Sequence, residues 1–393
     1  MIPQARTVGA VLVKRSVHGT TSGLNVLRKG RAIILTLNRP KALNSLDTAM
    51  CADLKSLLLQ WRDEDEGRRP LLFVVKGAGD RSFCAGGDVK AVWQELQEMR
   101  TRSQPVGTGA RGSLHVDFFR TEYEMNYLLG TTTIPQVSLW SGLVMGGGVG
   151  ISVLGKYRVA TEKTIFAMPE TAIGLFPDVG SSYWLPKLKP AGFGLYMGLS
   201  GARLEASDLI QTGIATHFVL SSHLENLESD LSKIDDSRQV DQILATFHLK
   251  SLPFLKTGNA VLPLSAVKIT DVFASHDDEP DVRLEKILEK LSTRAQTCSW
   301  SKDTLERISK MSRTSLLLTQ LQLKRGATMT LKECLEMEFR LMMRCIAAPD
   351  FTEGIRAVLI DKDHSPRWVS TPNSQGLRDY FSNLEKAENE LAI

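Results

Sequence analysis

The chain has 393 residues, of which 42% are hydrophobic and 23% charged, and its formal net charge is +4. This composition is typical of a globular protein that buries a large core, in one large domain or two. The weak and dispersed positive charge gives no reason to expect a nucleic-acid partner, and no run of 18 apolar residues predicts membrane insertion. The five cysteines lack a C-x-x-C pair, which disfavours a disulfide framework or a zinc site and favours a reducing compartment.

The first 21 residues differ in composition from the rest of the chain. They carry Arg6, Lys14 and Arg15 among threonine, serine and small apolar residues, and the first acidic residue of the chain is Asp47. This pattern is typical of a mitochondrial transit peptide, with a disordered tail as the alternative. On either interpretation, residues 1–21 lie outside the fold.

The residues that follow predict alternating strands and helices, which is typical of an α/β core. Runs of β-branched or apolar residues predict strands, and apolar residues at helical spacing predict helices. In chain order we expect a strand at 32–37, a helix capped by Asp47 and running to about Trp61, a strand at 71–75, a helix at 89–99, a polar loop at 100–113, a helix at 118–129, and strands at 136–139, 157–160 and 164–167.

After about Val219 the pattern changes to longer helical segments with more charge. Residues 314–324 and 331–346 are amphipathic, and the apolar stripe of the second is interpreted as packing against the first part of the chain. We therefore expect a transit peptide at 1–21, a core containing the active site at 24–219, and a helical region at 220–393 that packs on this core.

Two glycine-rich turns follow apolar segments, at 83–88 (FCAGGD) and at 145–150 (MGGGVG). Glycines leave backbone N–H groups unobstructed by Cβ atoms, so two such turns could hold one carbonyl oxygen as it becomes an oxyanion. Either turn alone indicates only a tight connection. The second run also lacks the spacing of a dinucleotide-binding fingerprint. Cys84 is interpreted as a small buried thiol, in preference to a nucleophile.

Two acids follow the second glycine turn. Glu170 ends the run 167–170 (AMPE), and Asp178 lies eight residues further on. Apolar neighbours such as Ile173 and Phe176 predict partial burial, which would raise the pKa of both carboxyls towards a catalytically useful range. Glycine turns and carboxylates together favour acyl chemistry that stabilises an oxyanion and needs no metal.

Several of these motifs resemble those of a known family. The run 37–44 (LNRPKALN), the two glycine turns and Met168-Pro169-Glu170 are similar to the crotonase (enoyl-CoA hydratase/isomerase) superfamily. Residues 168–180, 214–219 (IATHFV) and 353–363 (EGIRAVLIDKD) resemble its branch that hydrolyses 3-hydroxyisobutyryl-CoA. The resemblance covers about residues 24–380. It implies an α/β fold with a crotonase-type spiral of ββα turns and a C-terminal helical region, and no cofactor other than the CoA carried by the substrate.

The resemblance also implies a role for five residues. The backbone amides of Gly87 and Gly147 correspond to the oxyanion hole for the thioester carbonyl. Glu170 takes the position of the catalytic carboxylate, and Asp178 that of a second acid that binds substrate and handles protons. Glu122 corresponds to the residue that contacts the acyl group. Whether Glu170 attacks the carbonyl or activates water is left open.

The implied activity is hydrolysis of 3-hydroxyisobutyryl-CoA, and also of 3-hydroxypropionyl-CoA, in valine breakdown in the mitochondrial matrix. One alternative is another acyl-CoA enzyme such as an enoyl-CoA hydratase. Hydratases, however, have a second glutamate where this chain has Gly150 and a glycine where it has Asp178. The other alternative is a non-catalytic mitochondrial small-subunit ribosomal protein derived from this family, which the intact pair of Glu170 and Asp178 argues against. The sequence does not indicate an oligomeric state.

Overall fold

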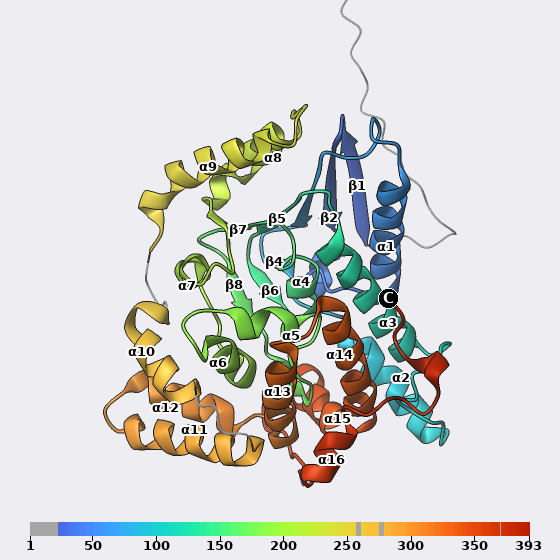
Figure 1. The fold of residues 1–393 in the computed structure, drawn as a ribbon, viewed down its shortest axis with the longest axis vertical. Coiled ribbons are helices and arrows are strands. Elements are labelled where there is room, and N and C mark those ends of the chain that lie inside the picture. Colours follow the sequence, from blue (N-terminus) through green and yellow to red (C-terminus); the bar gives the residue numbers. More distant parts are fainter. Residues whose placement is uncertain (1–22, 257–260, 275–278, 370) are drawn as a thin grey trace, which may run out of the picture.

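Two β-sheets form the centre of the protein (Figure 1), seen in a computed structural model that describes residues 23–256, 261–274, 279–369 and 371–393. The predicted transit peptide lies outside these residues. The larger sheet has the order β1-β2-β3-β5-β7-β9, and the smaller has the order β4-β6-β8. β1 is antiparallel to β2, and all other paired neighbours are parallel. The strands are β1 (Leu24–Lys29), β2 (Ala32–Leu37), β3 (Leu72–Gly77), β4 (Ser82–Cys84), β5 (Gln136–Trp140), β6 (Leu143–Met145), β7 (Tyr157–Ala160), β8 (Ile165–Ala167) and β9 (His217–Phe218).

Helices surround both sheets and make up most of the second half of the chain (Figure 1). None of the helices in the described part of the chain is both long and apolar enough to cross a membrane. The helices are α1 (Thr48–Asp63), α2 (Val89–Thr101), α3 (Leu114–Thr131), α4 (Gly147–Gly150), α5 (Ser181–Trp184), α6 (Phe193–Ser200), α7 (Ala206–Gln211), α8 (Leu224–Leu231), α9 (Gln239–Ser251), α10 (Leu262–Phe273), α11 (Pro280–Ala295), α12 (Ser299–Ser309), α13 (Arg313–Gly326), α14 (Leu331–Ala347), α15 (Pro349–Ile355) and α16 (Ser374–Asp379).

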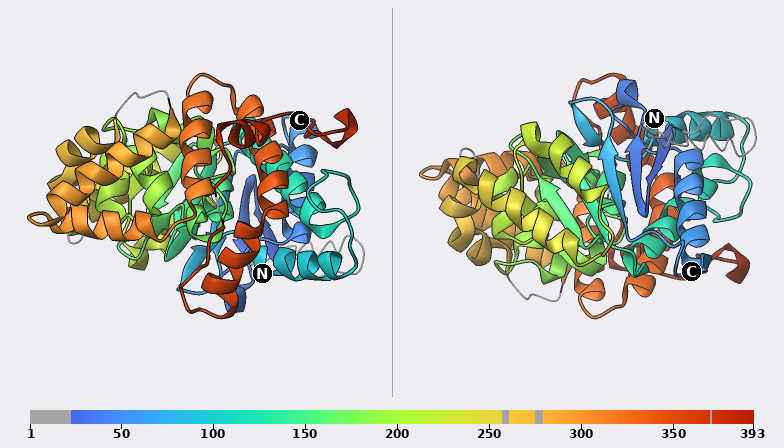
Figure 2. Two further views of the ribbon diagram at one scale, coloured as in Figure 1. Left: turned by 90° about the horizontal axis from the view of Figure 1, so that it is seen from below. Right: turned by 90° about the horizontal axis from the view of Figure 1, so that it is seen from above.

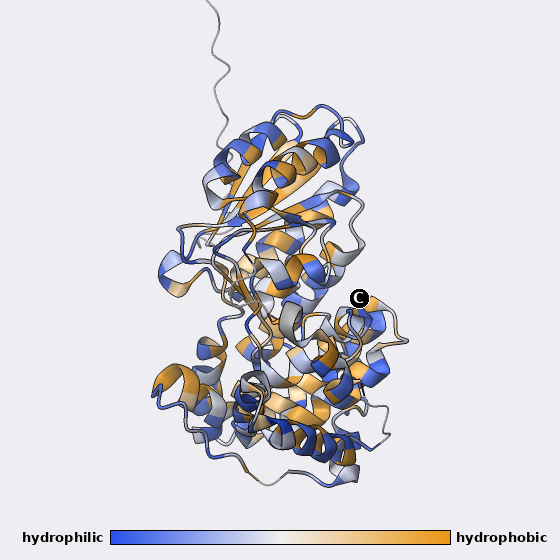
Figure 3. Ribbon diagram, turned by 90° about the vertical axis from the view of Figure 1, so that its left-hand side faces the viewer, coloured by the Kyte–Doolittle hydropathy of each residue, from blue (hydrophilic) through white to orange (hydrophobic). Residues whose placement is uncertain are grey.

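The larger sheet is buried on both faces. Successive side chains of a strand point to opposite faces, so Ile33 and Leu35 join the main core with α1, whereas Ile34 and Val74 join a second core. α8 and α9 cover this second face, for example through Leu227. Burial on both faces also explains why β3 is apolar throughout, because parallel strands covered on both sides have no polar face. Figure 3 shows the resulting hydrophobic strands beneath helices whose outer sides are hydrophilic.

The chain alternates between the two sheets. β3, β5 and β7 of the larger sheet are each followed by a strand of the smaller sheet, namely β4, β6 and β8. Since these three short strands are parallel neighbours, their carboxyl ends lie at one edge. The residues that follow the strands at this edge are 85–88, 146–148 and 168–170. The topology therefore brings both glycine turns and Glu170 together.

The structure confirms the α/β class and the C-terminal helical region predicted from the sequence. It also contains β1, β4, β6 and β9, which the sequence interpretation omitted. β4 and β6 have only three residues each and lead directly into glycine turns. Their sequences therefore indicate a turn and not a strand. Asp47 caps α1 as expected, because its side chain accepts a hydrogen bond from the Met50 amide at 2.9 Å.

The C-terminal helices pack on the smaller-sheet side of the fold. α13 and α14 contact α5, α14 also contacts α3, and α15 contacts α2 and the short 3₁₀ helix η2 (Glu170–Ile173). Figure 2 shows α11 and α12 at the opposite end of the molecule from α1. The apolar stripe of α14 is buried through Leu335, Phe339 and Met342, which confirms that it is a core-packing face.

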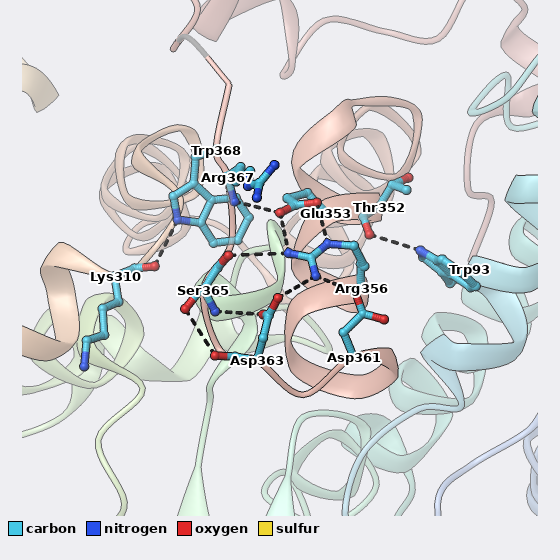
Figure 4. A network of polar contacts seen from close by, with 10 residues as sticks. All are labelled: Trp93, Lys310, Thr352, Glu353, Arg356, Asp361, Asp363, Ser365, Arg367 and Trp368. Carbon is cyan, nitrogen blue, oxygen red and sulfur yellow. Dashed lines mark hydrogen bonds and ion pairs between the residues drawn. The ribbon is translucent and has the colours of Figure 1, made fainter.

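A polar network holds the motif at 353–363 in place (Figure 4). The Arg356 guanidinium donates to the carboxylates of Glu353, Asp361 and Asp363 at 2.6–2.9 Å. Trp93 of α2 donates to the Thr352 carbonyl at 3.0 Å, which joins α15 to the helix after the first glycine turn. The network thereby fixes α15 beside η2, the element that carries Glu170.

We predict that Gly354→Ala destabilises the protein by about 1–3 kcal/mol, as overpacking does in other cores. An added Cβ would lie 2.5 Å from the Ile173 Cα and carbonyl carbon, so α15 would have to move away from η2. Thermal denaturation measures the change. Gly67→Ala is the matched control, since no atom lies within 4 Å of its added Cβ. Equal melting temperatures for the two variants would contradict the packing described here.

Candidate active site

A pocket of about 90 Å³ lies at the carboxyl edge of the smaller sheet. All five residues singled out in the sequence line it: Gly87, Gly147, Glu122, Glu170 and Asp178. They come from four separate segments of the chain, so their meeting is a result of the topology. Their chemical roles remain predictions.

The first glycine turn is held by the 37–44 motif. The buried Asn44 side chain donates to the carbonyls of Ala78 and Ser82 at 3.0 and 2.8 Å, which fixes the loop beside β4. Leu46 then pairs with the turn, because its amide donates to the Gly86 carbonyl at 2.9 Å and its carbonyl accepts from Asp88 at 2.8 Å. Gly86 has a φ of +112°, a conformation that favours glycine. The motif therefore shapes a turn whose Gly87 amide stays uninvolved in this pairing.

The second glycine turn lies against the first. Gly147 is the first residue of α4, so its amide has no acceptor within the helix. A Cβ added to Gly147 would lie 3.1 Å from the Gly87 nitrogen. In the described segments, neither of these two amides donates to a protein acceptor. Two adjacent free N–H groups are what an oxyanion hole requires.

Two buried glutamates face the second turn. The Glu170 carboxylate, on η2, would be 3.0 Å from a Cβ on Gly146, and the Glu122 carboxylate, on α3, would collide with a Cβ on Gly147. Glu122 is 2% exposed and Glu170 6% exposed. One oxygen of each carboxyl has no hydrogen-bond partner in the described structure. Buried polar atoms are normally paired, so these two oxygens lack a partner that a ligand in the pocket would supply.

Asp178 completes the group of acids, and a residue that the sequence interpretation missed holds it. The buried hydroxyl of Tyr123 donates to the Asp178 carboxylate at 2.7 Å. Tyr123 follows Glu122 on α3, and it is packed edge-on against Phe339 of α14 with ring centroids 6.3 Å apart. An aromatic residue in a helix looks like any core residue in sequence, so only its contact reveals the polar role.

Burial changes the protonation of all three acids, as the sequence predicted for Glu170 and Asp178 but not for Glu122. It raises the pKa of Glu122 and of Glu170 well above the usual range, and the charge of Asp178 raises both further. Burial also raises the pKa of Asp178, to about 6, while the hydrogen bond from Tyr123 lowers it. The acids therefore bind protons more tightly than three separate carboxyls in water, and they titrate as a coupled group.

The residue after Asp178 has a strained backbone. Val179 has a φ of +53°, which is a rare conformation for a β-branched residue and costs about 1–3 kcal/mol. Its side chain fills the space next to Gly150, because a Cβ there would lie 2.5 Å from the Val179 Cβ. A side chain at position 150 would therefore not fit in this structure.

Cys84 is buried behind the first turn, and burial raises the pKa of its thiol to about 12. This confirms the interpretation of Cys84 as a structural residue, because a nucleophilic cysteine needs a lowered pKa. In the part of the chain that the structure describes, no group of three or more His, Cys, Asp or Glu side chains is arranged to hold a metal ion.

Comparison with known proteins agrees with this fold. Residues 32–376 match the model of the enoyl-CoA hydratase/isomerase family. The 3-hydroxyisobutyryl-CoA hydrolases named as mitochondrial from Xenopus laevis and Homo sapiens are 42% and 40% identical to the chain. These alignments cover 94% of the chain and 91% of the frog protein, and 92% of the chain and 89% of the human protein.

Solved structures lead to the same family. An enoyl-CoA hydratase from Rhodobacter sphaeroides superposes with a TM-score of 0.77 at 29% identity, covering 95% of this chain and all of that one. A carnitinyl-CoA dehydratase from Mycobacterium thermoresistibile gives a TM-score of 0.79 at 29% identity, covering 95% and 99%. The chain belongs to the enoyl-CoA hydratase/isomerase family, and the predicted crotonase-type fold is confirmed.

We predict that Tyr123→Phe raises the pKa of Asp178 above its value of about 6. The lost hydroxyl stabilises the ionised carboxylate, and removing it favours the protonated form. The limb of the pH–rate profile that Asp178 controls should move to higher pH, whether Asp178 acts as acid or base. Tyr127→Phe, one turn along α3, is the control. An unchanged profile for Tyr123→Phe would show that this hydrogen bond does not govern Asp178.

Proposed function

We propose that this protein hydrolyses the thioester of 3-hydroxyisobutyryl-CoA, and also that of 3-hydroxypropionyl-CoA, to release CoA and the 3-hydroxy acid. The observation that carries the proposal is the pair of free amides at Gly87 and Gly147 facing buried, unpartnered carboxyl oxygens in one pocket. The names of the relatives support the same reaction.

The geometry supports a division of roles. The thioester carbonyl oxygen binds between the two amides, which stabilise the negative charge that develops on it; such donors are each worth roughly 10²–10³ in rate. Glu170 lies beside the second turn and acts on the carbonyl carbon, either as a nucleophile that forms an acyl–glutamyl anhydride or as a base that activates water. The C–S bond breaks, and the CoA sulfur takes a proton from Asp178 or from water. On the nucleophilic route, water then hydrolyses the anhydride, which releases the 3-hydroxy acid and restores the Glu170 carboxylate.

The size and lining of the pocket support a small hydroxyacyl group. Phe118, Phe119 and Leu175 contribute apolar walls, and the volume of about 90 Å³ suits a short acyl chain. Glu122 and Asp178 provide the polar groups that a hydroxyl at the 3-position needs. No resident cofactor enters this proposal, because CoA arrives with the substrate.

The structure gives a reason to prefer hydrolysis over hydration. The resemblance places the second glutamate of hydratases at position 150, where Val179 leaves no room for a side chain. A non-catalytic ribosomal role is also disfavoured, since three acids that are buried at a desolvation cost around one pocket are typical of a functional site.

The proposal includes the mitochondrial matrix as the location and valine breakdown as the pathway. The relatives named as mitochondrial and the basic, acid-free composition of residues 1–21 support the location.

We predict that Glu170→Gln lowers kcat for 3-hydroxyisobutyryl-CoA by roughly 10²-fold or more. The side-chain amide of glutamine neither attacks the thioester carbonyl nor accepts a proton from water. Binding of the CoA ester should remain within a few-fold of wild type. A free-thiol release assay measures the rate, and calorimetry with the inactive variant measures binding. Glu98→Gln, an exposed residue on α2, is the control. Near-normal turnover in Glu170→Gln would remove Glu170 from the mechanism.

We also predict that kcat/KM for 3-hydroxyisobutyryl-CoA exceeds that for isobutyryl-CoA by about tenfold or more. The unsubstituted acyl group would leave the buried Glu122 oxygen without a partner and the Asp178 carboxyl with only the Tyr123 hydroxyl. The same thiol-release assay with both esters tests this. Equal kcat/KM values would show that the acyl pocket is assigned wrongly, without affecting the role of Glu170.

A further inference from the structure

Glu338, in the middle of α14, is a buried acid that the mechanism above does not use. Its exposed fraction is 0%, and no Lys or Arg forms an ion pair with it in the described parts of the chain. Fully buried glutamates are rare unless they are paired, so this one needs a local explanation. Its partners are backbone amides: Gly180 donates to one carboxylate oxygen at 2.7 Å, and Ser182 donates to the other at 2.9 Å.

The Gly180 amide belongs to the turn that follows Asp178, and the Ser182 amide belongs to the first turn of α5. The turn after Asp178 contains two consecutive left-handed residues, Val179 and Gly180, at φ of +53° and +88°. α5 starts directly after it, and no local side chain caps that helix. The Glu338 carboxylate supplies the missing acceptor from a helix more than 150 residues away in the chain. A strained turn persists only where its surroundings hold it, and these two hydrogen bonds do so.

Other groups hold the same segment. Gln322 of α13 donates to the Pro177 carbonyl at 2.6 Å, and Tyr123 of α3 donates to the Asp178 side chain. Phe339, the neighbour of Glu338 on α14, packs against the Tyr123 ring. Burial raises the pKa of Glu338 to about 8, the hydrogen bonds from Ser182 and Gly180 lower it, and the charge of Asp178 makes a smaller contribution to the rise. Glu338 is therefore within electrostatic reach of the active-site acids.

We propose that Glu338 is a positioning residue that fixes the backbone from Asp178 to Ser182 and thereby holds the Asp178 carboxyl against Glu170 and the acyl pocket. This inference rests on the proposed thioester hydrolysis. It assigns a function in that reaction to the C-terminal helical region, whose described residues contribute no side chain to the pocket lining. Glu338 acts through Asp178 and does not touch the substrate.

The test is a double-mutant cycle with Glu338→Gln and Asp178→Asn, assayed by thiol release from 3-hydroxyisobutyryl-CoA. Glutamine has the size of glutamate, but its NH₂ group faces a backbone N–H, so one of the two hydrogen bonds is lost. We expect kcat to fall by about tenfold in the wild-type background with little change in KM. In the Asp178→Asn background we expect the same change to cost less than about twofold, because the group being positioned is already disabled.

Controls separate positioning from general stability. Glu336→Gln lies on the same helix and alters only a surface ion pair with Lys332, so it should leave kcat unchanged. Glu338→Asp keeps two carboxylate acceptors on a shorter side chain and should retain more activity than Glu338→Gln. If the glutamine variant does not fold, Glu338→Asp takes its place in the cycle.

Two results would overturn the inference: an unchanged kcat in the Glu338 variants, or an equal loss of kcat with and without Asp178. The single variants distinguish this failure from that of the proposed function. If Asp178→Asn keeps the wild-type kcat, the assignment of the site itself is wrong. If Asp178→Asn is impaired and Glu338→Gln is not, only the positioning role fails.

Discussion

The arrangement of the candidate active site depends on the parallel alignment of three short strands. β4, β6 and β8 are hydrogen-bonded neighbours that run in the same direction, so the chain leaves all three at one edge. The two glycine turns and Glu170 come directly after these strands in the chain, so they lie at that edge. Helix α3 then brings Glu122 to the same place from the side, and the remaining structure buries this group without filling the pocket.

Burial is what gives these residues their chemical character. A carboxyl in water is a weak base and poorly matched to proton transfer at neutral pH, whereas removal from water raises its pKa. Here the charge of Asp178 also raises the pKa of Glu122 and of Glu170, so the cost of burying these acids is high. The fold meets part of this cost with specific hydrogen bonds, such as the one from Tyr123 to Asp178. It leaves one oxygen of Glu122 and one of Glu170 unpaired, which suits them to bind a substrate.

The helical C-terminal region holds the segments that carry the active-site residues. Side chains of α13 and α14 form hydrogen bonds with the backbone on both sides of Asp178, and α15 packs against η2. The network around Arg356 in turn fixes α15 (Figure 4). Without α14, the Gly180 and Ser182 amides would lose the carboxylate that accepts their hydrogen bonds. The two parts of the chain are thus joined by polar contacts at the site as well as by apolar packing.

The sequence alone determined the α/β class, the strands β2, β3, β5, β7 and β8 and the helices α1, α2, α3, α13 and α14, because these depend on local patterns. The five candidate site residues came from motifs within short segments and their resemblance to a family. The sequence did not reveal Tyr123 or Glu338 as polar partners, nor the three-residue strands β4 and β6. Tyr123 has the pattern of a core aromatic, and Glu338 that of an ordinary helical glutamate. Their partners lie 55 and about 160 residues away in the chain. Only the tertiary structure decides such contacts, since a hydrogen bond between distant segments leaves no periodic signal in either one, and burial depends on every element that surrounds a side chain.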